Sequence, residues 1–375
     1  MTQNSFSISY PAVYNGTEKS NISFFSGTPD LDKLFFTDLA LNENEDTKRF
    51  FVTDATVASL PCNASFIEKF DDGKYGNNFI LILGSGEKYK TTESVLRIVT
   101  EATKVGLSRK DIFVGIGGGV ICDITAFAAS IYKRGASVQF VPTTLLAMVD
   151  ASIGGKTGCD YENYKNLIGT FFPASNLYYF PEFVQYLPEN QYNSGLAEAF
   201  KTALICDKNL YEIFRDKSEE INNRNKDVLE EMIRMCVQDK ASIVEKDFTE
   251  QNIRAFLNLG HTFGHAFESV AGLGTVTHGS AVAWGISRCV ELAFKKEYCL
   301  EKFRNEVFDI LNKYDWEATP TPKEILGGGI GERLVAVMKK DKKNLSDKIR
   351  VVLIKGICDI SIEEIDDEAI LSVLK

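Results

Sequence analysis

The chain has 375 residues, enough for one large or two medium-sized domains. Its hydrophobic share of 44% suffices for a packed core, and its charged share of 25% is ordinary for a globular protein. A net charge of −10 argues against bulk attraction to nucleic acid or to a membrane surface. The eight dispersed cysteines include no Cys-x-x-Cys pair, which argues against a thiolate zinc site. Interpreted as free thiols, they indicate a reducing compartment.

The N-terminal segment, residues 1–20, is polar and lacks the apolar stretch of a signal peptide. The longest apolar runs fall well short of the roughly eighteen residues that a membrane-spanning helix needs. We therefore expect a cytoplasmic protein with no membrane partner and no nucleic-acid partner.

The first half of the chain alternates short apolar runs with helical patterns, which is typical of parallel βαβ units. We expect strands at 49–54, 79–83, 111–116 and 137–141, with helices at 91–105 and 120–132. Each strand runs into polar or glycine residues, and ligands of parallel sheets bind beyond the carboxyl ends of the strands. The residues at these ends are Asp54, Gly84–Gly86, Gly117–Gly119 and Thr143–Thr144.

The second half is dominated by long amphipathic segments, at 193–206, 226–244, 256–270, 280–295 and 301–313, with one late strand at 348–354. Pro173, Pro181 and Pro188 punctuate the transition. The predicted fold is an α/β Rossmann-like domain with a parallel sheet over 1–180, followed by a mostly α-helical domain over 181–375.

Three consecutive glycines, Gly117–Gly119, lie between a predicted strand and the helix that carries Asp123. Without side chains, their N–H groups can approach a pyrophosphate at the helix N-terminus. Nucleotide binding is therefore favoured over the alternative of a plain tight turn. Asp54 suits a ribose hydroxyl, although a helix cap explains it equally well.

All three histidines lie between positions 261 and 278. His261 and His265 are four residues apart and share one helix face, and His278 begins the next helical segment. Glu198 lies among small apolar residues, where an unpaired charge is costly. One glutamate and two histidines are compatible with a metal site that keeps open positions. The alternative is a satisfied core glutamate with solvated histidines.

Several basic residues lie beside turns and are suited to anion binding, although each alone is more often a surface charge: Lys156, Lys165, Lys201, Lys240, Arg254 and the pair at 342–343. Lys156 and Lys165 follow or precede glycines, which permit close approach to a phosphate.

Taken in order, these motifs resemble the 3-dehydroquinate synthase family of the sugar-phosphate cyclases. The resemblance extends from about Asp54 to Arg350 and rests on Gly117–Asp123, Arg134-Gly135, Pro142–Thr157, Lys165–Gly169, Gly195–Lys201, Asn258–Ala266 and His278-Gly279. Cys122, Ala126, Tyr164, Pro181 and Asn190-Gln191 depart from the usual family residues, and none of them is a proposed ligand.

The resemblance implies that the domain over 1–180 binds NAD and that the domain over 181–375 binds the substrate and a divalent metal, zinc or cobalt or another cation. It makes Glu198, His261 and His278 the metal ligands and turns His265 toward the substrate. The implied NAD contacts are Asp54, Glu87, Lys90, Gly118, Gly119, Asp123, Thr143 and Thr144.

The implied substrate is a sugar phosphate with a carboxylate. Its phosphate would meet Lys156, Asn166, Lys201 and His265, and Arg134 would reach it from the neighbouring subunit of a homodimer. Its carboxylate would meet Lys240, Arg254 and Lys343, and its hydroxyls Asp150 and Asn258.

The implied activity is that of a phosphate-eliminating lyase of the shikimate pathway. It would convert 3-deoxy-arabino-heptulosonate 7-phosphate to 3-dehydroquinate by transient oxidation, elimination, reduction and aldol cyclisation. The alternatives are another sugar-phosphate cyclase, such as an aminodehydroquinate or deoxy-inosose synthase, or a metal-dependent alcohol dehydrogenase. The three basic residues assigned to the carboxylate favour a carboxylated substrate.

Overall fold

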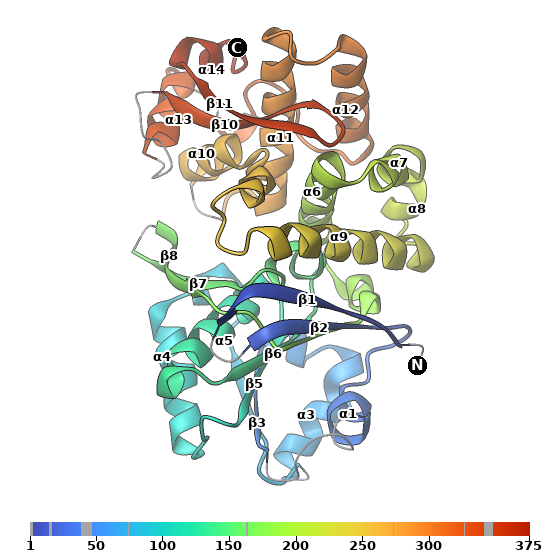
Figure 1. Cartoon of the computed structure of the whole chain (residues 1–375), viewed down its shortest axis with the longest axis vertical. Helices are drawn as coiled ribbons and strands as arrows, with labels where there is room; N and C mark the ends of the chain where they lie inside the picture. The colour runs from blue at the N-terminus through green and yellow to red at the C-terminus, as the bar shows by residue number, and fades with distance from the viewer. Residues whose placement is uncertain are drawn as a thin grey trace. The chain divides into compact units, whose positions relative to one another are not determined.

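The computed structural model describes residues 3–14, 17–38, 47–73, 75–162, 164–272, 274–325, 327–340 and 348–375. The chain forms two compact units, Met1–Leu187 with Lys240–Thr249, and Pro188–Asp239 with Glu250–Lys375 (Figure 1). The predicted boundary at 180/181 lies close to the first division, and the return of Lys240–Thr249 to the first unit is a feature that the sequence did not indicate. The assignment of NAD to one domain and of metal and substrate to the other stays a prediction.

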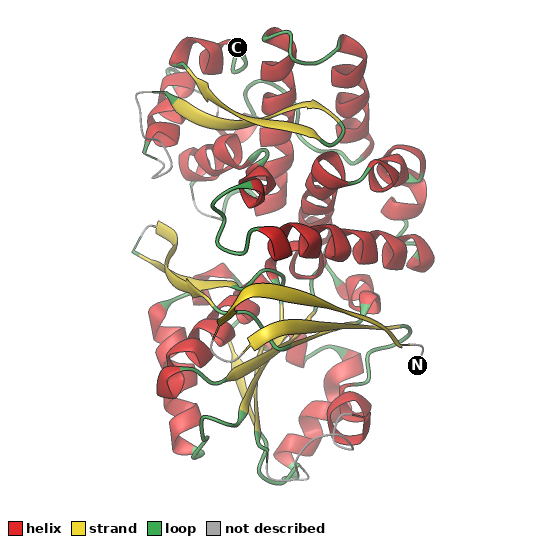
Figure 2. Ribbon diagram, viewed as in Figure 1, coloured by secondary structure: helices red, strands yellow, loops and turns green. Residues whose placement is uncertain are grey.

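The described part of the first unit contains a seven-stranded sheet with the order β1-β2-β9-β6-β5-β3-β4 (Figure 2). β1 is antiparallel to β2, and every other neighbouring pair is parallel. The strands are β1 (Gln3–Tyr14), β2 (Thr17–Phe25), β3 (Arg49–Asp54), β4 (Phe79–Leu83), β5 (Ile112–Gly117), β6 (Ser137–Pro142) and β9 (Asn176–Tyr179). A separate antiparallel hairpin pairs β7 (Lys156–Tyr161) with β8 (Tyr164–Phe171).

The four strands predicted in the first half are confirmed as β3, β4, β5 and β6. β5 is buried throughout and β3 nearly so, which explains their continuous apolar runs. The β7–β8 hairpin escaped prediction because β8 is largely exposed and carries no apolar run. The antiparallel β1 makes the sheet mixed rather than wholly parallel.

Five helices of the first unit are described: α1 (Leu31–Lys33), α2 (Ala55–Ala58), α3 (Ala64–Asp71), α4 (Thr92–Lys104) and α5 (Gly119–Ile131). α4 and α5 match the two predicted helices closely. The Thr91 side chain caps α4 by accepting a hydrogen bond from the Ser94 N–H at 3.3 Å. α5 packs against β5, β6 and β7, so its glycine-bearing N-terminus lies at the carboxyl end of β5.

The second unit is mostly helical, as predicted. Its described helices are α6 (Glu189–Cys206), α7 (Lys208–Asp216), α8 (Ser218–Asn222), α10 (His261–Ala271), α11 (His278–Lys295), α12 (Glu301–Lys313), α13 (Ile330–Lys339) and α14 (Asp367–Ser372), and α9 (Lys226–Lys246) begins in this unit and ends in the first. The predicted late strand is β10 (Ile349–Gly356), which pairs antiparallel with β11 (Asp359–Ile365).

Packing between α10 and α11 centres on Trp284, which is fully buried. The rings of Phe263 and Phe267 lie 6.2 and 5.0 Å from its ring, and its indole N–H donates to the Thr319 carbonyl at 2.9 Å. This apolar contact joins the two helices that carry all three histidines.

One predicted helix proved to be two elements. Residues Ile253–Asn258 form a 3₁₀ turn, and α10 begins only at His261, after Gly260 in the left-handed conformation with φ 80°. A Cβ at Gly260 would lie 2.7 Å from the Val282 carbonyl oxygen of α11. The glycine therefore both breaks the helical run and lets α10 approach α11 closely.

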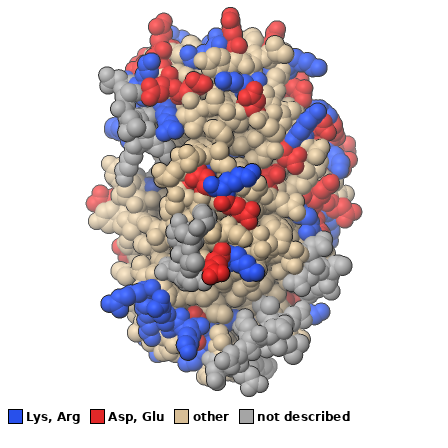
Figure 3. Space-filling model, viewed as in Figure 1, with Lys and Arg blue, Asp and Glu red and all other residues tan. Residues whose placement is uncertain are grey.

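No described helix is long and apolar enough to cross a membrane. On the face drawn in Figure 3, acidic and basic side chains are interspersed, so the negative net charge is not gathered in one patch there.

Candidate metal centre and anion-binding residues

Glu198 is a fully buried carboxylate in the middle of α6, flanked in sequence by Ala197 and Ala199. Lys201, one turn further along the helix, is equally buried and forms an ion pair with Glu198 Oε2. Burying one charge without its partner would be strongly unfavourable. Lys201 therefore gives the carboxylate a cationic neighbour that holds it in its charged state.

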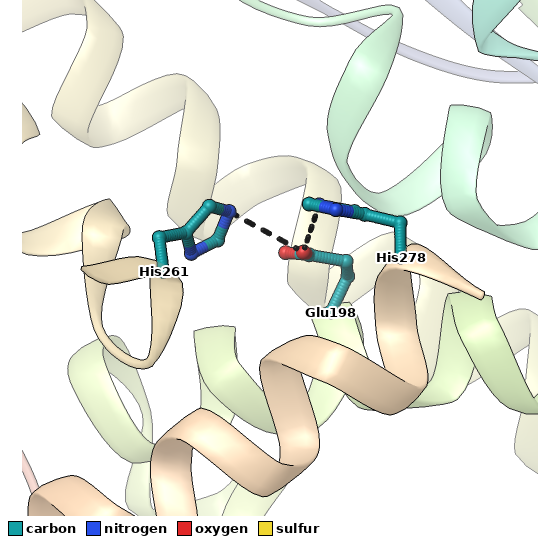
Figure 4. A group of neighbouring side chains, drawn as sticks. All are labelled: Glu198, His261 and His278. Atoms are coloured by element: carbon teal, nitrogen blue, oxygen red, sulfur yellow. Dashed lines mark ion pairs between the residues drawn. The ribbon is translucent and has the colours of Figure 1, made fainter. Parts of the chain in front are cut away.

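Two histidines approach the same carboxylate from other helices (Figure 4). His261 is the first residue of α10, and its Nε2 lies 3.6 Å from Glu198 Oε1. His278 is the first residue of α11, and its Nε2 lies 3.2 Å from the same oxygen. The Thr277 side chain caps α11 by accepting from the Ser280 N–H at 3.2 Å, which fixes where this helix begins.

The electrostatics of this group are dominated by burial and by one lysine. Burial acts to raise the carboxyl pKa of Glu198, but Lys201 and the two imidazoles outweigh it, and the pKa lies well below its usual value. Burial, reinforced by Lys201, holds the pKa of His261 well below its usual value, so this imidazole is neutral. Burial also acts to lower the pKa of His278, but Glu198 and Glu268 raise it to about 9.

The three side chains fit a divalent cation. One ligand atom of each lies within 4.8 Å of the others, and both carboxylate oxygens of Glu198 are buried without a well-formed hydrogen bond among the described residues. Atoms that bind one zinc ion at about 2 Å lie roughly 3–3.5 Å apart. The two Nε2–Oε1 distances are already close to that spacing.

His265 lies outside this group, one helical turn after His261, and is exposed. Its ring centre lies 5.2 Å from that of His261 and 5.9 Å from that of His278. The structure brings His265 together with Glu268 and His278 instead. This arrangement is compatible with the role toward substrate that the family resemblance implies, which stays a prediction.

The other predicted residues of the second unit are placed as follows. Arg254 is almost wholly buried in the 3₁₀ turn before α10. Asn258 ends that turn, and its amide N–H group donates to Glu250 Oε1 at 2.6 Å and to the Ala255 carbonyl at 3.0 Å. Lys343 lies outside the described residues.

In the first unit, the predicted NAD residues gather at the carboxyl edge of the sheet. Lys90 and Asp123 form a buried ion pair at 2.6 Å, and the charge of Asp123 counteracts burial so that the pKa of Lys90 is raised. Glu87 lies near Lys90 and adds to that effect. Gly118 precedes α5, and Gly119 is its first residue.

Three further residues at this edge have structural partners. Asp54 caps α2, accepting from the N–H groups of Thr56 and Val57 at 2.9 and 3.2 Å. The backbone N–H of Thr143 donates to the Gly117 carbonyl at 2.9 Å, and the Thr144 hydroxyl accepts from the Ala147 N–H at 3.1 Å. The cap that sequence offered as one explanation of Asp54 is thus present, and a ribose contact stays a prediction.

The predicted substrate residues of the first unit lie on different elements. The Lys240 ammonium donates to Asp150 Oδ1 at 2.7 Å and to the Asp150 carbonyl at 2.6 Å. Lys156 begins β7, and Asn166 lies in β8 with a left-handed φ of 51°. Arg134 also has a left-handed backbone, with φ 64°.

Sequence reasoning missed three carboxylates that contact predicted site residues. Glu268 lies 3.5 Å from His278 Nδ1, Glu250 accepts from Asn258, and Asp160 Oδ1 accepts from the Asn166 N–H at 2.7 Å. Only Glu268 left a signal in the sequence, because it follows His261 by seven residues and so shares its helix face. The other two act through turns that residue spacing does not reveal.

Two family models match the chain. The model described as "3-dehydroquinate synthase N-terminal" matches residues 80–194, and "3-dehydroquinate synthase C-terminal" matches residues 195–344. A 3-dehydroquinate synthase of Dictyoglomus thermophilum is 38% identical over 306 residues, which cover 81% of this chain and 84% of the relative.

Solved structures agree in fold. The 2-epi-5-epi-valiolone synthase ValA of Streptomyces hygroscopicus, with NAD+ and Zn2+ bound, matches with a TM-score of 0.80 and 25% identity, covering 94% of this chain and 95% of its own. A 2-deoxy-scyllo-inosose synthase complexed with carbaglucose-6-phosphate, NAD+ and Co2+ matches with a TM-score of 0.81 and 23% identity over 99% of both chains. The matched domains and the identity over most of the chain's length place this protein in the 3-dehydroquinate synthase family.

Proposed function

We propose that this protein is a 3-dehydroquinate synthase, a lyase that converts 3-deoxy-arabino-heptulosonate 7-phosphate to 3-dehydroquinate and inorganic phosphate. The observation that carries the proposal is the convergence of Glu198, His261 and His278 in a chain of this family. The reaction oxidises one alcohol carbon, eliminates phosphate, reduces the same carbon and closes a ring by aldol addition. Because the oxidation is reversed within each turnover, the reaction needs NAD only as a catalyst.

Glu198, His261 and His278 would hold a divalent cation, zinc or cobalt or another metal. Their buried carboxylate oxygens and imidazole nitrogens suit such an ion, which would displace the Nε2 proton of His278 on binding. A cation held there would supply Lewis-acid chemistry that lowers the pKa of the substrate hydroxyl, and NAD would supply the hydride acceptor. Lys201 would keep Glu198 ionised and, as a buried cation, would also attract the substrate phosphate.

The NAD contacts would be Asp54, Glu87, Lys90, Gly118, Gly119, Asp123, Thr143 and Thr144. Gly118 and Gly119 offer backbone N–H groups at the N-terminus of α5, where a pyrophosphate is favoured. A Cβ at Gly118 would lie 3.0 Å from the Thr144 side chain, so a larger residue there would crowd the same edge.

The remaining residues would position the substrate. Lys156, Asn166, Lys201 and His265 would bind its phosphate, Lys240, Arg254 and Lys343 its carboxylate, and Asp150 and Asn258 its hydroxyls. The ion pair between Lys240 and Asp150 supports the last two assignments, because it fixes a cation beside a hydroxyl acceptor before substrate arrives.

The chain would act as a homodimer in which Arg134 reaches the neighbouring site. Lys133 and Arg134 are both left-handed, with φ 47° and 64°, a conformation that costs non-glycine residues about 1 kcal/mol or more each. Such strain is often kept where a side chain must be aimed. Mixing Arg134→Ala chains with inactive Glu198→Ala chains tests the shared site.

In the hybrid dimer, one intact site receives Arg134 from the partner chain, so activity should return to about a quarter of the wild-type level after random exchange. Native mass spectrometry would establish that hybrids form. Hybrids without any recovered activity would refute the shared site.

The activity itself is tested by incubation with the heptulosonate phosphate, NAD and zinc, followed by measurement of inorganic phosphate and identification of the product. Stoichiometric release of phosphate and dehydroquinate is expected, with no accumulation of NADH. Accumulating NADH would instead indicate an alcohol dehydrogenase. Turnover of an amino-substituted or carboxylate-free sugar phosphate, with none of the heptulosonate, would indicate another cyclase.

A further inference from the structure

His278 lies between two carboxylates, one at each ring nitrogen. Its Nε2 faces Glu198 Oε1 at 3.2 Å, and its Nδ1 faces Glu268 Oε2 at 3.5 Å. Glu268 lies on α10, and its side chain is 7% exposed, so its charge is held away from bulk water. Binding of a metal by His278 uses only Nε2, and Glu268 contacts the other side of the ring.

His261 shows the same arrangement with a different acceptor. Its Nε2 faces the same Glu198 oxygen at 3.6 Å, while its Nδ1 lies 3.2 Å from the backbone carbonyl of Leu259. Both histidines therefore turn one nitrogen to Glu198 and the other to a fixed oxygen. For His261 the fixed oxygen belongs to the backbone, and for His278 it belongs to Glu268.

A neutral imidazole carries one N–H and one lone pair, and only the lone pair binds a metal. An oxygen acceptor beside Nδ1 favours the tautomer with the proton on Nδ1, which leaves the lone pair on Nε2. It also restricts rotation of the ring. His278 needs such a restraint more than His261, because its side chain is 32% exposed against 14%.

We propose that Glu268 is a positioning residue of the metal centre, whose carboxylate accepts the Nδ1–H of His278 and so presents Nε2 to the cation that Glu198 and His261 also bind. This inference rests on the proposed function only in requiring that these three residues bind a divalent metal. It does not depend on which substrate the enzyme uses.

The test is metal binding by the full-length apoprotein, without substrate or NAD. Zinc affinity is measured by competition with a chromophoric chelator, and the visible spectrum of the cobalt complex reports the coordination geometry. Glu268→Ala should weaken zinc binding about 10- to 100-fold and alter the cobalt spectrum, because outer-shell partners of a ligand histidine have effects of that size. Glu268→Gln, which keeps the shape and one neutral acceptor, should recover part of the affinity.

Glu291→Gln is the matched control. Glu291 is a half-buried carboxylate on α11, the helix of His278, and its described ion pair is with Arg304 at 2.8 Å. Its loss should change thermal stability and leave zinc affinity and the cobalt spectrum unchanged. If Glu268→Ala does not fold, Glu268→Leu, which keeps most of the volume but offers no acceptor, takes its place.

Wild-type affinity and a wild-type cobalt spectrum in a folded Glu268→Ala or Glu268→Leu protein, neither of which has a side-chain acceptor, would overturn the inference. The inference would also be overturned if the wild-type protein bound two metal ions and the Glu268 variant bound one. Glu268 would then be a ligand of a second cation beside His265. Normal zinc binding by the wild type without any turnover of the heptulosonate would count against the proposed function alone.

Discussion

The two units bury charge in different ways. In the first, Lys90 and Asp123 form one cation–anion pair at 2.6 Å at the edge of the sheet. In the second, Glu198 has Lys201 on one oxygen but two imidazole nitrogens on the other, and neither oxygen makes a well-formed hydrogen bond within the described chain. In the first pair, one cation neutralises one anion. In the second group, one lysine lies beside a carboxylate and two imidazoles, which together offer more electron-pair donors than one ammonium group can bind. That excess is what a metal site requires of its ligands.

The largest expected effect follows removal of a ligand from the second group. Glu198→Ala or His261→Ala should lose the metal and reduce kcat by about 1,000-fold or more, since a bound cation supplies several kcal/mol of stabilisation to the transition state. Metal content by atomic spectroscopy and initial rates of phosphate release measure both losses.

His265→Ala is the control for these variants. It should keep the metal while slowing turnover, because its imidazole lies outside the group around Glu198. If His265→Ala lost the metal and His278→Ala kept it, the ligand assignment would be wrong.

For the Lys90–Asp123 pair, removing one partner should lower the free energy of unfolding more than removing both. Lys90→Met leaves Asp123 as a buried unpaired carboxylate and should cost about 3–5 kcal/mol of unfolding free energy in urea. The double variant Lys90→Met, Asp123→Leu should recover most of that loss, because no charge stays buried. Equal stability of the single and double variants would show that the pair is not coupled.

A third acid shows what burial does to a carboxylate whose pKa is not lowered by any described cation. Burial, with a smaller contribution from Asp207, raises the pKa of Asp239 to about 7, the reverse of Glu198. Because its pKa rises from 3.8 on folding, the folded state binds this proton more tightly, and stability falls as pH rises between those values. Above about pH 7 both states are ionised and the loss is complete.

Asp239→Asn should therefore stabilise the protein by about 2 kcal/mol near pH 8, allowing for partial solvent screening, and by almost nothing near pH 4. Urea unfolding of both proteins across this range measures the difference. A gain that did not grow with pH would mean that Asp239 is ionised in the folded state.

The smallest effect concerns Asp54 at the sheet edge of the first unit. Asp54→Ala removes the cap of α2 and should cost about 1 kcal/mol, whereas Asp54→Asn should keep most of the cap. If Asp54 also holds the ribose, both variants should weaken NAD binding, measured by calorimetry. Wild-type NAD affinity of Asp54→Asn would show that Asp54 caps α2 and does not contribute to NAD binding.

Much of the fold followed from local pattern. The strands β3, β4, β5 and β6 and the helices α4, α5 and α12 were predictable because apolar runs and apolar periodicity report which parts of an element are buried. The hairpin β7–β8 was not predictable, because β8 is largely exposed. The break at Gly260 was not predictable either, because it depends on the close approach of α11.

The same division holds for the candidate site. The sequence by itself determined the residue types and the helical spacing of His261 and His265, and through its motifs it identified the family. Residue spacing alone would have paired His261 with His265, and the family resemblance named His278 instead. Only the tertiary structure shows that His278 Nε2 lies 3.2 Å from an oxygen of Glu198 and that Glu268 lies at its other ring nitrogen. The reason is physical: spacing along a helix reports which side chains share a face, whereas the approach of α6, α10 and α11 is set by packing around Gly260 and Trp284.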